Sequence, residues 1–337
     1  MYGHSHPAIK EAIERVLLLG HSLGGTNPQE AELGEMLVSR FPSIDMIRFC
    51  NSGNEANTFA IATALSFNQR RKVMVFEDGY HGGNLMFPAT PSRLNIPHHF
   101  VFGRYNDIER TRENIDDEIG VILVEPMQGA GGSILGSKEF LTFLRQEATR
   151  IGAILIFDEV ITSRLYYGGL QEYFEVIPDM TTMGKHFGGG LAFGAFGGRQ
   201  DIMRQYELSQ KDPLFHSGTW NNNRFTVAAG SVGTSLLTRE ALDKANTLGD
   251  KLRDGMRMIF EAKSPPVGFV RGFGSVVGYG FHGPDAEILR EAFFYHMVKK
   301  RIYIGSRGFI ALNILHDGKH VDRALDAVRC FVEEAFA

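Results

Sequence analysis

The sequence predicts an α/β fold, in which a larger domain built on a mostly parallel sheet is followed by a smaller α+β domain. Short unbroken apolar runs recur in the first part of the chain, and helical periodicity separates them. Such runs are typical of strands buried on both faces, and their alternation with helices indicates a parallel sheet. From about residue 236 the pattern changes. We therefore expect an N-terminal segment over 1–27, a large domain over 28–235 and a small C-terminal domain over 236–337.

Two helices are expected first, because apolar residues recur at helical spacing over 7–19 and again over 28–40. Pro7 suits the first turn of the first helix, and Phe41 with Pro42 ends the second. Apolar runs bounded by turn residues then predict the strands of the sheet, with a helix at Glu139–Arg150 among them. The predicted strands are Val73–Phe76, Val121–Val124, Ile154–Phe157 and Met180–Met183.

The predicted small domain opens with a long amphipathic helix at Arg239–Ala262. Strands are expected at Val267–Phe281 and Tyr303–Ile314, with a helix at Ala286–Lys300 between them. A closing helix is expected at His320–Phe336. This mixture of elements indicates an α+β arrangement.

The composition excludes several classes of protein. Of the 337 residues, 43% are hydrophobic and 22% are charged, which is ordinary for a globular protein. The 35 basic and 39 acidic residues give a net charge of −4, so we expect no general attraction to nucleic acid or to an anionic membrane. The only cysteines are Cys50 and Cys330, which excludes a disulfide framework or a four-cysteine zinc site and fits a reducing, cytoplasmic location. No apolar stretch reaches the ~18 residues of a membrane span, and no metal site is expected.

Polar and glycine-rich residues follow each predicted strand. Tyr80 follows the first, Glu125 the second, Asp158 the third and Lys185 the fourth. Because ligands bind at the carboxyl ends of strands in open α/β sheets, the sequence predicts a site that contains a tyrosine, carboxylates and a lysine. Structural alternatives stay open: Lys185 as a solvated surface lysine, Asp158 as a helix N-cap, and Glu125 as a strand terminator. The neighbouring His81, taken alone, is more often a structural histidine.

The segment Asn51–Ala56 precedes a helical stretch and suits a phosphate. Small residues at a helix start present free N–H groups and the positive end of the helix dipole. The spacing matches neither a Walker loop nor G-x-G-x-x-G, so a nucleotide is not indicated. The alternative is an ordinary N-cap at Ser52. A phosphate cradle, a lysine, a strand-end aspartate and an aromatic side chain together suit pyridoxal 5′-phosphate (PLP), whose aldehyde bonds a lysine amine and whose ring nitrogen pairs with an aspartate.

Six motifs occur in order along nearly the whole chain: NSGNEA (51–56), GYHGG (79–83), VEPMQGAGG (124–132), IFDEV (156–160), GKHFGGGLAFGAFGG (184–198) and HSGTW (216–220). Together they resemble the motifs of class III PLP-dependent aminotransferases, which have fold type I. Within that class the chain is most similar to the glutamate-1-semialdehyde aminomutase-like group. Finer details resemble β-amino-acid transaminases of the β-phenylalanine type, namely DEVITSR (158–164), TWNNN (219–223) and SRGFIAL (306–312).

The resemblance implies three catalytic residues, namely Lys185, Asp158 and Tyr80. Lys185 would form the Schiff base with PLP and then move the proton between the substrate and the cofactor. Asp158 would pair with the pyridinium nitrogen, while Val160 and Tyr80 would pack on opposite faces of the ring. The other cofactor-binding residues implied are Ser52, Gly53 and Asn54 at the phosphate, Glu125, and Thr219 from the neighbouring subunit.

A threonine supplied by the neighbouring subunit implies a homodimer with shared active sites. Arg307 is the candidate for the substrate carboxylate, because arginine offers a bidentate fork. The activity implied is amino transfer from an amino acid, including a β-amino acid, to a 2-oxo acid such as 2-oxoglutarate. The alternative within the same group is the intramolecular amino shift of the aminomutase.

The chain also departs from the family pattern. Asn54 stands where the family usually has threonine, and its amide can still donate to a phosphate. Ile161 stands where many ω-aminotransferases have a glutamine that contacts the cofactor, which argues against the ornithine and 4-aminobutyrate branches. Family members usually carry several tens of residues before GHSHP (3–7), so we expect a truncated N-terminus.

Two other functions fit parts of the sequence. Residues 20–24 fit the G-x-S-x-G nucleophile elbow of α/β-hydrolases, with Ser22 as the nucleophile. That elbow requires preceding sheet strands, whereas the residues before Gly20 predict a helix. A non-catalytic paralogue that keeps the fold is the second alternative, and the retained Lys185 and Asp158 argue against it.

Overall fold

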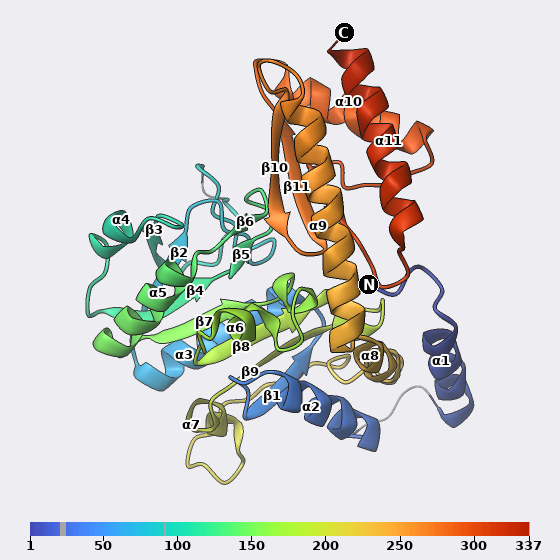
Figure 1. Cartoon of the computed structure of the whole chain (residues 1–337). Coiled ribbons are helices and arrows are strands. Elements are labelled where there is room, and N and C mark those ends of the chain that lie inside the picture. Colours follow the sequence, from blue (N-terminus) through green and yellow to red (C-terminus); the bar gives the residue numbers. More distant parts are fainter. Residues whose placement is uncertain (21–24, 91, 337) are drawn as a thin grey trace. The chain divides into compact units, whose positions relative to one another are not determined.

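The computed structural model describes residues 1–20, 25–90 and 92–336 and divides into two compact units. The larger unit comprises Tyr2–Gln128 and Gly136–Thr238, and the smaller one comprises Met1, Gly129–Leu135 and Arg239–Ala337. Figure 1 shows the sheet and helices of each unit. The predicted α/β class with a mainly parallel sheet is confirmed. The exact domain boundaries predicted from the sequence stay a prediction.

The larger unit is built on a seven-stranded sheet with the order β1-β9-β8-β7-β4-β2-β3. All neighbouring pairs are parallel except those of β9, which runs antiparallel to both β1 and β8. Every residue of β4, β7 and β8 is buried. The apolar runs of β4 and β7 predicted this burial, whereas β8 reads MTTMG and buries two threonines. The strands are β1 (Met46–Cys50), β2 (Lys72–Phe76), β3 (His99–Gly103), β4 (Ile119–Val124), β7 (Ile154–Asp158), β8 (Met180–Gly184) and β9 (Gly194–Gly198).

Strands β1, β3 and β9 were not predicted from the sequence. Strand β9 reads GAFGG, and glycine is normally depleted in strands. Its glycines are required by crowding, because a Cβ on Gly197 would lie 2.6 Å from the backbone oxygen of Met46. Where a neighbouring backbone leaves no room for side chains, a strand contains glycine instead of an apolar run, and the apolar pattern does not reveal it.

Helices cover the sheet of the larger unit. α3 (Gly53–Asn68) packs on β4, β7, β8 and β9 through small buried residues such as Ala56, Ala60 and Ala64. α5 (Lys138–Ile151) packs on β4 and β7; Ser137 caps its start, and Gly152, with a φ of 70°, ends it. The other helices are α1 (Pro7–Leu19), α2 (Pro28–Arg40), α4 (Ile108–Arg112), α6 (Gly169–Phe174), α7 (Gln200–Met203) and α8 (Arg224–Leu236). Short elements are the 3-10 helices η1 (Thr162–Arg164), η2 (Lys185–Gly188) and η3 (Arg204–Tyr206), and the strand β5 (Met127–Gln128).

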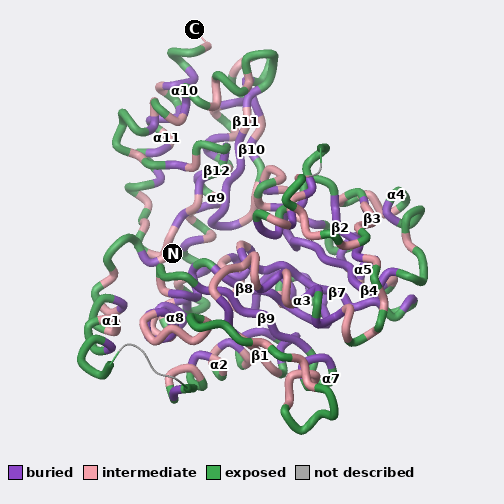
Figure 2. Tube along the Cα trace, turned by 180° about the vertical axis from the view of Figure 1, so that it is seen from behind, coloured by how far each residue is buried: buried purple, intermediate pink, exposed green. Residues whose placement is uncertain are grey.

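The smaller unit is α+β, with an antiparallel sheet in the order β10-β11-β12. Its core gathers aromatic side chains that include Phe260, Phe281, Phe293 and Phe331, and Figure 2 shows the buried residues along its strands and helices. Its elements are β6 (Ile134–Leu135), α9 (Arg239–Glu261), β10 (Gly268–Phe273), β11 (Val276–Phe281), α10 (Ala286–Lys299), β12 (Phe309–Ala311) and α11 (Gly318–Ala335).

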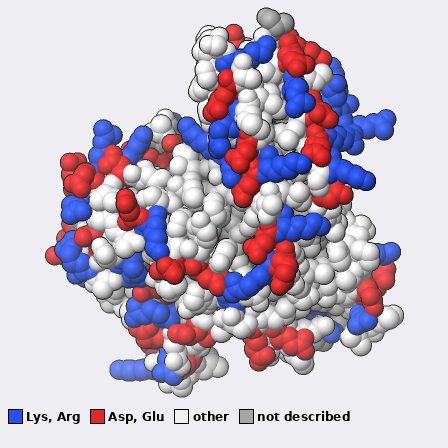
Figure 3. Space-filling view, viewed as in Figure 1, with Lys and Arg blue, Asp and Glu red and all other residues white. Residues whose placement is uncertain are grey.

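Two strand predictions in this unit were wrong in extent. The stretch predicted as one strand over 267–281 is a hairpin that turns at Gly274, whose φ is 51°. The strand predicted over 303–314 is confined to β12. Figure 3 shows acidic and basic side chains interspersed on the face that it draws. Some charges of the chain pair along a helix, as Arg290 and Glu287 do in α10. Within the described residues, no helix is long and apolar enough to cross a membrane.

Candidate active site

Asp158 ends β7 and is only 4% exposed. Its Oδ2 accepts from Nδ2 of Asn57 at 2.8 Å and contacts Nδ1 of His81 at 2.8 Å. Its Oδ1 accepts from the backbone N–H of Val160 at 3.0 Å. Polar groups from three separate segments therefore surround this carboxylate. The helix N-cap reading of Asp158 does not account for these contacts.

The start of α3 lies beside this carboxylate. Ser52 is the N-cap of α3, and its Oγ accepts from the backbone N–H of Glu55 at 3.2 Å. A Cβ on Gly53 would lie 2.8 Å from Cγ2 of Val160, so Val160, two residues after Asp158, packs directly against the helix start. Residues 51–55 are all half-buried. A partly open helix start whose first turn is backed by glycine fits the phosphate of PLP.

Asn54 and Gly82 pack against each other at the same place. Gly82 has a φ of 129°, and a Cβ there would lie 2.5 Å from Cβ of Asn54. The Oδ1 atom of Asn54 is buried and makes no hydrogen bond within the described part of the chain. The GYHGG and NSGNEA motifs therefore pack against each other at Gly82. Any other residue at this position would displace Asn54 or the turn.

Lys185 directly follows β8 and opens η2 with a φ of 50°. A positive φ is strained for a residue with a side chain, and such strain is concentrated at functional sites. A Cβ on the preceding Gly184 would lie 3.3 Å from the backbone nitrogen of Gly53, so the end of β8 abuts the start of α3. In the β7–β8 register, Asp158 pairs with Thr182. The structure therefore brings Lys185, Asp158 and the start of α3 to one edge of the sheet, while the Lys185 side chain is exposed in the single chain.

Glu125 and Tyr80 meet at the same edge. Glu125, which follows β4, is buried, and its Oε1 accepts from the backbone N–H of Tyr80 at 3.1 Å. The side chain of Tyr80 is 39% exposed. Glu125 thus holds the backbone of the residue predicted to cover the cofactor ring. Among the described residues, no group of His, Cys, Asp and Glu side chains could hold a metal ion.

The remaining predicted residues lie elsewhere. Thr219 is exposed, in the segment between η3 and α8. Arg307 belongs to the smaller unit, so its part in substrate binding stays a prediction. Ile161 precedes η1 and is half-buried. Ser22, the nucleophile of the hydrolase alternative, lies outside the described residues.

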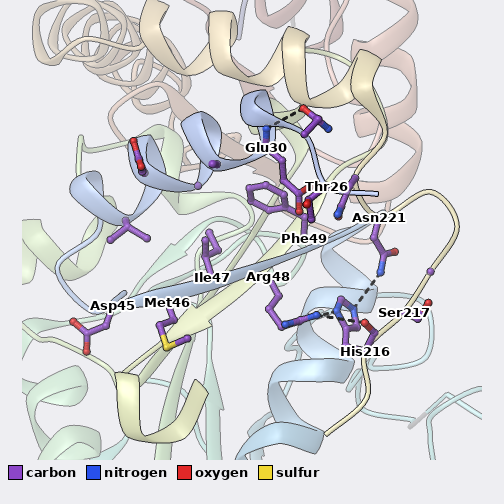
Figure 4. A pocket seen from close by; sticks show the side chains of 17 residues that line it. Thr26, Glu30, Asp45, Met46, Ile47, Arg48, Phe49, His216, Ser217 and Asn221 are labelled. Atoms are coloured by element: carbon purple, nitrogen blue, oxygen red, sulfur yellow. Dashed lines mark hydrogen bonds between the residues drawn. The ribbon is translucent and has the colours of Figure 1, made fainter. Parts of the chain in front are cut away.

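A hollow of about 840 Å³ in the larger unit is bounded by α2, β1 and the segment 216–222, and its lining includes neither Lys185 nor Asp158. Figure 4 shows Arg48 and Asn221 converging on His216. Arg48 Nε donates to Nδ1 of His216 at 3.1 Å, and burial together with the charge of Arg48 lowers the pKa of His216 to about 4. The segment 216–222, which forms one wall of this hollow, is hydrogen-bonded to the residues that lead into α3: Nδ2 of Asn51 donates to Oδ1 of Asn221 at 2.9 Å.

Two buried residues that link to Asp158 were not predicted from the sequence, namely Asn57 and Thr182. Asn57 is 1% exposed, on a face of α3 otherwise made of Ala56, Ala60 and Ile61. A buried amide requires hydrogen-bond partners. The signal available in the sequence was therefore an asparagine among apolar residues on one face of a predicted helix.

Comparison with known proteins gives the family. The model of the class III aminotransferases matches residues 1–316. The beta-phenylalanine transaminase of Variovorax paradoxus is 41% identical over 98% of this chain and 79% of its own length. The glutamate-1-semialdehyde 2,1-aminomutase of Opitutus terrae is 34% identical over 99% of this chain and 85% of its own.

Solved structures agree. A beta-phenylalanine aminotransferase from Variovorax paradoxus matches with a TM-score of 0.94 and 41% identity, covering 99% of this chain and 80% of that one. A transaminase with PLP bound matches with a TM-score of 0.92 and 27% identity, covering 99% and 84%. The predicted resemblance and the PLP dependence of the family are confirmed. The chain belongs to the class III aminotransferases, which are PLP-dependent enzymes of fold type I.

Proposed function

We propose that this chain is a transaminase that takes the amino group of a β-amino acid and passes it to a 2-oxo acid, with Lys185 as the residue that bonds the cofactor. The observation that carries the proposal is the convergence of Lys185, Asp158 and the start of α3 at one sheet edge. PLP supplies an aldehyde that bonds amines and a ring that withdraws electrons from the substrate. The protein supplies binding, orientation and proton transfer.

The side chains divide these tasks. Asp158 presents a buried carboxylate to the ring nitrogen, and Lys185 moves the proton at the substrate carbon. Val160 and Tyr80 orient the ring from its two faces, and Glu125 fixes the backbone of Tyr80. The phosphate is held by Ser52, Gly53 and Asn54 at the positive end of α3, with Thr219 contributed by a second subunit.

A homodimer completes this assignment. Thr219 and Trp220 are exposed in the single chain, and Lys185 is exposed as well. A second copy that supplied Thr219 would also cover this open edge and exclude water from it. We place the enzyme in the cytoplasm, in keeping with its two cysteines.

The β-amino-acid donor is supported by the likeness to the beta-phenylalanine transaminase of Variovorax paradoxus, with Arg307 as the candidate carboxylate ligand. The likeness to aminomutases supports intramolecular transfer as the second candidate. The test is to incubate the PLP-loaded enzyme with β-phenylalanine, with and without 2-oxoglutarate. A transaminase turns over only when the acceptor is present. Turnover of glutamate 1-semialdehyde without any acceptor would favour the aminomutase.

A further inference from the structure

We propose that Thr182 and Asn57 are positioning residues for Asp158, and that they set the carboxylate against the cofactor ring nitrogen. The inference rests on the proposed function and deepens it. Three buried side chains support it: Thr182 is 0%, Asn57 is 1% and Asp158 is 4% exposed. The two side-chain hydrogen bonds that link these residues are both buried, where a hydrogen bond is electrostatically stronger than in water.

The amide of Asn57 uses all of its donors. Its Oδ1 accepts from Oγ1 of Thr182 at 2.6 Å. Its Nδ2 donates to Oδ2 of Asp158 at 2.8 Å and to the backbone oxygen of His81 at 3.0 Å. A side-chain amide offers two N–H donors, and both are engaged here.

Only one orientation of this amide satisfies its neighbours. If the amide were turned over, Oδ1 would face the carboxylate of Asp158 and the carbonyl of His81, which are both acceptors. The hydroxyl of Thr182, which can donate, stabilises the orientation that points Nδ2 at Asp158. The hydroxyl of Thr182 therefore acts on the carboxylate of Asp158 through Asn57, in addition to the pairing of the two residues in the register of β7 and β8.

The network also assigns the two carboxylate oxygens different tasks. Oδ2 has two side-chain neighbours, Asn57 and His81, whereas Oδ1 has the backbone N–H of Val160. The oxygens of an ionised Asp158 can only accept. The contact between Oδ2 and Nδ1 of His81 then requires His81 to carry a proton on Nδ1. Asn57 and His81 thus anchor Oδ2, and Oδ1 is the oxygen left with acceptor capacity for the N–H of the ring.

The test compares two matched threonines. Thr182→Val removes the hydroxyl that holds Asn57. Thr63→Val is the control, because Thr63 is equally buried, lies on α3, and spends its hydroxyl on the Phe59 carbonyl and on Tyr206 instead. Thr182→Ser restores a hydroxyl and should restore wild-type behaviour. Each variant is loaded with PLP labelled with ¹⁵N at the ring nitrogen.

Two quantities are measured: the ¹⁵N chemical shift of the ring, which reports whether the nitrogen is protonated, and the dissociation constant of PLP. Thr182→Val should shift the ring signal toward the unprotonated form and weaken PLP binding about 2- to 10-fold, as expected for one hydrogen bond. Asn57→Leu, which removes the donor to the carboxylate itself, should weaken binding about 10- to 100-fold. Thr63→Val should leave the ring signal unchanged.

The outcomes separate the two proposals. If wild-type protein binds PLP and turns over, but Thr182→Val and Thr63→Val give the same ring signal and affinity, the positioning role is overturned while the proposed function stands. If wild-type protein fails to bind PLP, the proposed function falls, and this inference falls with it. A shift in Thr182→Val that Thr182→Ser reverses supports the inference.

Discussion

Replacing Gly82 with alanine should disrupt the joint between the GYHGG turn and the start of α3. Gly82 is buried, has a φ of 129°, and faces Asn54 so closely that an added Cβ would lie 2.5 Å from Cβ of Asn54. A change of rotamer cannot relieve that overlap, because a Cβ atom does not move when its side chain rotates. The backbone of the turn or the start of α3 must shift instead.

Two effects set the magnitude. A residue with a side chain held at a disfavoured φ costs about 1–3 kcal/mol, and overpacking a filled site costs about 1–3 kcal/mol more. The free energy of unfolding should therefore fall by about 2–6 kcal/mol, a large share of the ~5–15 kcal/mol that stabilises a typical protein. Because Asn54 is one of the proposed phosphate-binding residues, the affinity for PLP should fall as well.

The neighbouring Gly83 provides the matched control. A Cβ there would meet nothing within 4 Å, so Gly83→Ala should change the free energy of unfolding by less than about 1 kcal/mol. The assay is urea unfolding of both variants without cofactor, followed by circular dichroism, and then PLP titration. Equal unfolding midpoints for Gly82→Ala and Gly83→Ala would refute the packing of Gly82 against Asn54.

Two further predictions concern Lys185 and Asp158, and a third concerns His216. Lys185→Ala should still bind PLP through Asp158 and the start of α3 but should lose amino transfer; normal turnover would remove Lys185 from its proposed role. Asp158→Asn should stay folded, since an amide oxygen can still accept from Asn57, but should bind PLP about 10- to 100-fold more weakly in equilibrium dialysis because a charge-assisted pair is lost. His216, with a pKa lowered to about 4 by burial and by Arg48, binds a proton less readily in the folded state than in the unfolded state, where ~6.5 is usual. The contribution of His216 to stability is therefore complete above about pH 6.5 and is lost as the pH falls toward 4. His216→Gln should make the free energy of unfolding in urea less dependent on pH between these values. An unchanged pH dependence would contradict this prediction.

Much of the large unit was predictable because burial leaves a direct trace in sequence. Strands β4 and β7 are buried on both faces, and each contains an unbroken apolar run. Strand β8 is equally buried, although Thr181 and Thr182 separate its two methionines. The same rule placed Asp158 and Lys185 at strand ends. It failed for β9, where crowding by the neighbouring backbone selects glycine instead of apolar side chains.

The residues that hydrogen-bond to and around Asp158 could not be predicted from the spacing of motifs in the sequence. Asn57 and Thr182 are 125 residues apart, and they meet only because α3 packs across β8. Sequence identifies a helix and a strand but does not specify which of their side chains face each other. The contact of Glu125 with the backbone of Tyr80 was unpredictable for the same reason, since it depends on where the turn after β2 folds back.

The central claim is that Lys185 bonds the cofactor, and borohydride reduction tests it most directly. Protein loaded with PLP is reduced, digested and mapped by mass spectrometry. We expect the added mass on the peptide that contains Lys185, and no fixed label in Lys185→Ala. Cofactor fixed on a different lysine, or none fixed in wild-type protein that has taken up PLP, would contradict the assignment.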